Sequence, residues 1–134
     1  MNVAPALSDG LSAAPRTILV VEDEVLIRLT VSDYLRASGY QVIEASNADE
    51  ALRLLEADSR IDVVFSDVNM PGSLDGFGLA QWIRRERADV KVILASGAAR
   101  AAKIAGDPCE KSPFLRKPYA YADLERGIRT LIER

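Results

Sequence analysis

Residues 63–76, VVFSDVNMPGSLDG, decide how this chain folds and where its chemistry lies. The apolar run Val63–Phe65 is followed by one carboxylate, Asp67, and then by the turn-forming residues Pro71 and Gly72. An apolar run that leads into turn residues predicts a buried strand followed by a loop. Asp67 would then be held at the end of that strand, at the edge of a sheet and facing solvent.

Further apolar, β-branched runs of the same kind occur along the chain, with apolar residues at helical spacing between them. The predicted strands are 17–21, 41–45, 61–66, 90–95 and 114–116. The predicted helices are 25–38, 76–87, 99–106 and a last helix around 121–131. One more helix is predicted to begin at Asn47, where Asn47 and Glu50 resemble a capping box. This alternation predicts an α/β fold: a doubly wound, five-stranded parallel sheet with five helices on its two faces.

Parallel sheets of this kind place their functional sites at the carboxyl ends of the strands. The residues at the predicted strand ends are Glu22, Asp23, Asp67, Ser96 and Lys117. Three carboxylates at one edge repel each other unless a cation neutralises them, and oxygen ligands favour a hard ion such as Mg²⁺. A divalent cation, a lysine and a hydroxyl around one carboxylate would suit phosphoryl transfer to that carboxylate.

The composition excludes several classes of function. The chain of 134 residues has no histidine, which rules out catalysis by Ser-His or Cys-His pairs and zinc sites built on histidine. A net charge of −3 argues against direct binding to nucleic acid. The single cysteine, Cys109, cannot form an internal disulfide, which suits a reducing compartment.

The length fits one domain with a sizeable core. Residues 1–15 mix Ala, Pro, Ser and Gly without periodicity, so we expect a disordered N-terminal leader before a domain at 16–134. No apolar run reaches membrane-spanning length, and a signal peptide is not apparent. We therefore expect a cytoplasmic protein that makes no contact with the membrane.

Four motifs follow in order at the predicted strand ends: VVEDE (20–24), SDVNMPG (66–72), LASG (94–97) and LRKPY (115–119). Together they resemble the receiver (CheY-like) domain of two-component response regulators, over roughly residues 16–133. The resemblance implies a flavodoxin-like fold with strand order 2-1-3-4-5. It also implies a phosphorylation-dependent signalling switch and not an enzyme, here of the single-domain type without an output module.

Carried over to this sequence, the resemblance implies that Asp67 accepts the phosphoryl group. Asp23 would ligate Mg²⁺ directly beside Asp67, Glu22 would hold it through water, and Asn69 would offer its backbone carbonyl. Taken alone, Asn69 fits the start of the Pro-Gly turn equally well. The six residues 71–76 are one more than is usual in this loop, so the path of the backbone beside Asp67 stays open.

The resemblance implies that Ser96 and Lys117 bind phosphoryl oxygens, and that the Lys117–Pro118 bond is cis. Phe114 would reorient together with Ser96 on activation. Two residues depart from the commoner pattern: Ser96 stands for threonine, and Phe114 lacks the hydroxyl of the tyrosine often found there.

The partners implied are a donor of phosphohistidine, which is a sensor histidine kinase or a histidine phosphotransferase, and a downstream protein that the sequence does not identify. A second hypothesis is a small Mg²⁺-dependent, phosphatase-like enzyme with Asp67 as its nucleophile. A third, a degenerate receiver that binds partners without phosphorylation, is disfavoured because every group of the site is present.

Overall fold

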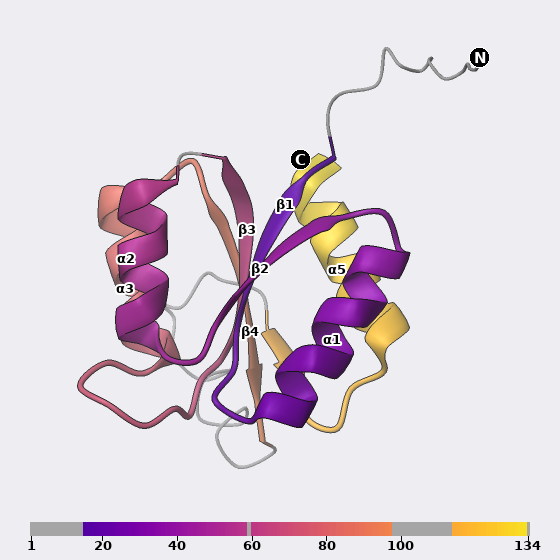
Figure 1. The fold of residues 1–134 in the computed structure, drawn as a ribbon, viewed down its shortest axis with the longest axis horizontal. Coiled ribbons are helices and arrows are strands. Elements are labelled where there is room, and N and C mark those ends of the chain that lie inside the picture. The colour runs from indigo at the N-terminus through magenta and orange to yellow at the C-terminus, as the bar shows by residue number, and fades with distance from the viewer. Residues whose placement is uncertain (1–14, 59, 98–113, 134) are drawn as a thin grey trace.

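The computed structural model describes residues 15–58, 60–97 and 114–133 (Figure 1). Its strands are β1 (Thr17–Val21), β2 (Gln41–Ala45), β3 (Ile61–Asp67), β4 (Lys91–Ser96) and β5 (Phe114–Arg116). Its helices are α1 (Val25–Ala37), α2 (Ala48–Ala57), α3 (Gly76–Glu86) and α5 (Tyr121–Glu133). The predicted helix at 99–106 and almost all of the predicted leader lie outside the described residues.

The five strands form one parallel sheet in the order β2-β1-β3-β4-β5, which confirms the predicted topology. The two central strands, β1 and β3, are nearly continuous apolar runs because helices cover both faces of the sheet. Helices α2 and α3 lie on one face, and α1 and α5 lie on the other (Figure 1).

Side chains of β1 divide the core into two layers. Leu19 and Val21 point to the side of α2 and α3, whereas Ile18 and Val20 point to the side of α1 and α5. All four side chains are fully buried. Each layer holds the central strands in place, so the strand ends that carry the candidate site residues are fixed relative to one another.

The start of α2 differs in one detail from the predicted capping box. The Asn47 side chain accepts a hydrogen bond from the Glu50 backbone N–H at 2.7 Å, as in that motif. Glu50 Oε1, however, accepts from the N–H of Ser46 at 2.7 Å, one residue before the cap. The cap residue Asn47 has an extended backbone, and this brings Ser46 within reach of Glu50.

Within the described ranges, no helix combines the length and the apolar character that crossing a bilayer requires. The four described helices have between 10 and 13 residues.

Candidate phosphoryl-acceptor site

Asp67 is the last residue of β3, and the neighbouring strand β4 fixes its position. It pairs in register with Ala95, and the next backbone N–H, that of Val68, donates to the Ala95 carbonyl at 2.9 Å. The Ser66 hydroxyl donates to the Asp67 carbonyl at 2.9 Å. Asp67 is only 8% exposed, so little of its carboxylate reaches solvent at the edge of the sheet.

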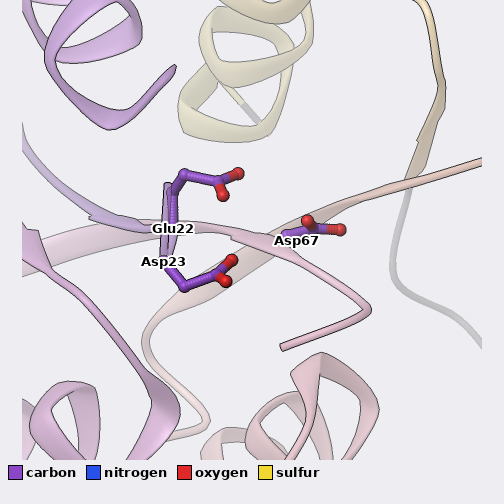
Figure 2. A group of neighbouring side chains, drawn as sticks. All are labelled: Glu22, Asp23 and Asp67. Carbon is purple, nitrogen blue, oxygen red and sulfur yellow. The ribbon is translucent and has the colours of Figure 1, made fainter. Parts of the chain in front are cut away.

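Glu22 and Asp23 follow directly after β1, the strand beside β3. Each of the three carboxylates, those of Glu22, Asp23 and Asp67, has an oxygen within 4.8 Å of an oxygen of the other two. Figure 2 shows the Glu22 and Asp23 carboxylates turned toward the side on which Asp67 lies. Three carboxylates at this spacing form an oxygen-rich group of the kind that holds a hard divalent cation.

Burial and the neighbouring charges together set the pKa of Glu22. Burial of its carboxyl, together with the charge of Asp67, raises the pKa of Glu22 to about 7, although a hydrogen bond from the Glu24 N–H at 3.0 Å opposes the shift. Near neutral pH, a proton therefore resides on the cluster for part of the time. A bound cation would compete with this proton, and the three carboxylates supply the oxygen ligands that a hard cation requires.

Lys117 supplies the positive charge on the other side of Asp67. Its Nζ donates to Asp67 Oδ2 at 2.9 Å, and its backbone N–H donates to the carbonyl of Ser96 at 2.7 Å. The Lys117–Pro118 peptide bond is cis, as the resemblance implies. Lys117 comes directly after β5, so the sheet brings it to the same edge as Asp67, 50 residues earlier in the chain.

Ser96 and Phe114 lie on β4 and β5, the last two strands in the order of the sheet. Ser96 ends β4, is fully buried and makes a long hydrogen bond of 3.5 Å to the carbonyl of Gly97. Phe114 pairs with Leu94 at the start of β5 and packs, half-buried, against the core layer under α2 and α3. The two side chains are therefore on adjacent strands.

The loop after Asp67 turns back toward the acceptor. The Asn69 N–H donates to Asp67 Oδ1 at 3.3 Å, and Gly72 turns the chain with a φ of +111°. The Asp75 side chain caps α3 by accepting from the N–H of Gly78 at 2.9 Å. The loop with its additional residue thus ends in a capped helix, and this defines the backbone path that the sequence left open.

Gly76 is a residue of the site that sequence reasoning treated only as the start of a helix. Its N–H donates to the Val68 carbonyl at 2.9 Å, and a Cβ at this position would lie 2.4 Å from the carbonyl oxygen of Asp67. Only glycine allows α3 to begin this close to the acceptor strand. The sequence signal was present, since the glycine directly follows the capping residue Asp75.

The model of the response regulator receiver domain matches residues 18–129. The chain belongs to this family. The sensor kinase CckA of Brucella abortus is 36% identical to the chain over 120 residues, which cover 88% of this receiver and 13% of CckA. The transcriptional regulatory protein PdtaR of Mycobacterium tuberculosis is 33% identical over 128 residues, which cover 95% of this receiver and 62% of PdtaR.

Solved receiver structures have the same fold. A response regulator receiver domain of Clostridium thermocellum is 30% identical with a TM-score of 0.82, and the match covers 89% of this chain and 95% of that one. The response regulator TrrA of Thermotoga maritima, solved in complex with Mg²⁺-BeF, is 29% identical with a TM-score of 0.73. That match covers 87% of this receiver and 98% of TrrA.

These matches establish that the chain is a receiver domain of the two-component type, a signalling domain that acts as a phosphorylation-dependent switch. They give no support to the alternative of a phosphatase-like enzyme. This receiver spans 13% to 62% of the length of the curated relatives described above.

Proposed function

We propose that Asp67 of this receiver accepts a phosphoryl group from a phosphohistidine, in a reaction that requires Mg²⁺. The observation that carries the proposal is the convergence on Asp67 of two further carboxylates and the Nζ of Lys117, which lies 2.9 Å from Asp67 Oδ2. The 134 residues contain no histidine, so the phosphohistidine would lie outside these residues, on a sensor histidine kinase or a histidine phosphotransferase.

Mg²⁺ would be held by the carboxylates of Asp23 and Asp67, by Glu22 through water and by the backbone carbonyl of Asn69. The three carboxylates have oxygens within 4.8 Å of one another, and this spacing favours a cation at this place. When bound, Mg²⁺ supplies positive charge that offsets the charge of the carboxylates and of an incoming phosphoryl group.

The protein groups then have separate roles. A carboxylate oxygen of Asp67 attacks phosphorus, the P–N bond to the histidine breaks, and the electron pair of that bond stays on the imidazole nitrogen. Lys117 Nζ leaves Asp67 Oδ2 and pairs with a phosphoryl oxygen, and the Ser96 hydroxyl donates to another. Phosphoryl transfer depends mainly on such positioning and on charge neutralisation.

Phosphorylation would bias a two-state element at the edge of the sheet. When Ser96 turns to the phosphoryl group, Phe114 on the adjacent strand would change its packing, and the surface around β5 and α5 would change for a partner protein. Water would later hydrolyse the acyl phosphate and reset the domain. We propose that this occurs in the cytoplasm, without direct contact to nucleic acid, and that the output is contact with a downstream protein or onward transfer of the phosphoryl group.

Intact-protein mass spectrometry after incubation with acetyl phosphate and Mg²⁺ tests the acceptor. We expect the wild type to gain the mass of one phosphoryl group and lose it slowly, and Asp67→Asn to gain none. Asp33→Asn, which changes an exposed aspartate on α1, serves as the matched control and should behave as wild type. An equal gain in wild type and Asp67→Asn would contradict the assignment of Asp67.

A further inference from the structure

Arg28 connects three elements behind the acidic cluster. It lies in the first turns of α1, and its side chain is only 16% exposed. Its Nη1 donates to the backbone carbonyl of Glu22 at 2.8 Å, and its Nε donates to Glu44 Oε1 on β2 at 3.3 Å. One guanidinium therefore ties the loop after β1 both to the following helix and to the neighbouring strand.

The carbonyl that Arg28 holds belongs to the peptide group between Glu22 and Asp23. On its other side, Glu22 is already fixed, because its N–H donates to the Ala45 carbonyl at 3.0 Å. Asp23 is exposed, so core packing does not set the direction of its carboxylate. The bond from Arg28 fixes the plane of the peptide from which Asp23 extends.

The guanidinium itself is held in place. Glu44 accepts from Arg28 through one carboxylate oxygen and from Arg36 Nη2 through the other, at 3.2 Å. Arg36 also donates to the carbonyl of Val42 at 3.2 Å. The charge of Arg28 is thereby paired with Glu44, on the side away from the acidic cluster, and the planar fork is oriented before any cation binds.

We propose that Arg28 is a positioning residue of the cation site: it holds the Glu22–Asp23 peptide so that the Asp23 carboxylate is directed at the place that Mg²⁺ would occupy. This inference rests on the proposed function, because it assumes that the cluster binds Mg²⁺. Groups that orient metal ligands in this way typically change metal affinity by about 10- to 100-fold.

The positive charge of Arg28 and its positioning role have opposite effects on cation binding. Charge alone would repel Mg²⁺, so its removal would tighten binding. Positioning requires the forked guanidinium, so its removal would weaken binding even when a positive charge is kept. The sign of the change in affinity therefore distinguishes the two roles.

The test measures the Mg²⁺ dissociation constant of the full chain by isothermal titration calorimetry, for wild type, Arg28→Lys and Arg28→Met. We expect both variants to bind Mg²⁺ about tenfold more weakly or worse. Arg126→Met, which removes one exposed positive charge from α5, is the charge-matched control and should bind as wild type. Thermal unfolding in EDTA shows whether each variant is folded. Glu44→Gln leaves the hydrogen bond from Arg28 to the Glu22 carbonyl in place, so it should weaken Mg²⁺ binding less than Arg28→Met does.

A second readout separates positioning of the cation from general damage. At saturating Mg²⁺, the rate of phosphorylation of Arg28→Lys by acetyl phosphate should return to within a few-fold of wild type. An unchanged or tighter Mg²⁺ dissociation constant in Arg28→Met, or an unchanged one in Arg28→Lys, would overturn the role of Arg28. A wild type that binds no Mg²⁺ would instead overturn the proposed function on which that role rests.

Discussion

At the scale of the residue, Glu22 makes the acidic cluster sensitive to pH. Its pKa is about 7 in the folded protein, mainly because of burial, against 4.5 for an unperturbed glutamate. Below about pH 4.5 the carboxyl is protonated in both the folded and the unfolded chain, so it costs no stability. As the pH rises toward 7, the unfolded chain releases this proton first, and the contribution of Glu22 to stability falls.

The first prediction is that Mg²⁺ stabilises the protein more at pH 8 than at pH 5. At pH 5 the proton on Glu22 competes with the cation, whereas at pH 8 the ionised cluster needs a counter-charge. Melting temperatures measured with EDTA and with Mg²⁺ at several pH values check this. In Glu22→Gln, the part of the pH dependence that comes from Glu22 should be absent. If Mg²⁺ raised the melting temperature of the wild type equally at pH 5 and pH 8, the prediction would be contradicted.

At the scale of the element, the start of α3 is packed against the acceptor strand. Gly76 allows this contact, because any side chain there would meet the backbone of Asp67 and Val68, at 2.4 Å and 2.7 Å from a Cβ. These are backbone atoms at the end of a central strand, so they cannot move aside as the tip of a flexible side chain could.

The second prediction is that Gly76→Ala lowers the free energy of unfolding by about 1–3 kcal/mol, the usual cost of overpacking. Because relief of the contact has to displace either α3 or Asp67, the rate of phosphorylation by acetyl phosphate should fall as well. Urea unfolding and the phosphorylation assay measure the two effects. Gly97→Ala is the matched control for stability, since a Cβ there meets no atom of the described residues within 4 Å. Equal stabilities of the two variants would contradict the prediction.

The elements also show how far sequence reasoning could reach. For the elements that the structure describes, strand and helix positions followed from periodicity to within one or two residues, because the sheet is buried on both faces and its strands are short apolar runs. The convergence of Glu22, Asp23, Asp67 and Lys117 followed from one rule, that parallel strands carry their sites at their carboxyl ends.

What sequence reasoning could not supply were contacts that depend on the third dimension. A glycine within a helix indicates only a low helix propensity, but in the structure a Cβ on Gly127 would lie 3.0 Å from Ile93 Cδ1, so Gly127 marks the close approach of α5 to β4. Arg28 reads as one more charge on an amphipathic helix, and its bond to the Glu22 carbonyl becomes visible only when β1, α1 and β2 are packed together. Periodicity reports which face is apolar, and it does not report the partner of a polar side chain.

At the scale of the whole molecule, a hydrogen bond joins the N-terminal half to the C-terminal helix. The Tyr40 hydroxyl donates to Glu125 Oε2 at 2.8 Å, which connects residues 85 positions apart. Burial, together with this bond and the charge of Glu125, raises the pKa of Tyr40 to about 12. The phenol therefore stays protonated and donating throughout the physiological range, and α5 is tied to the turn between α1 and β2.

The third prediction concerns this connection. Tyr40→Phe should lower the free energy of unfolding by about 1 kcal/mol, the usual net value of a hydrogen bond, or somewhat more because the acceptor is charged. A double-mutant cycle with Glu125→Ala, measured by urea unfolding, isolates the pair from the ion pair that Glu125 also makes with Arg129. Because α5 packs on the same sheet that carries Lys117, the loss should appear as a shift of one cooperative transition with an unchanged slope in urea. A separate early transition of α5 would show instead that the helix unfolds independently of the sheet. A coupling energy near zero between Tyr40 and Glu125 would show that their hydrogen bond does not stabilise the contact of α5 with the N-terminal half.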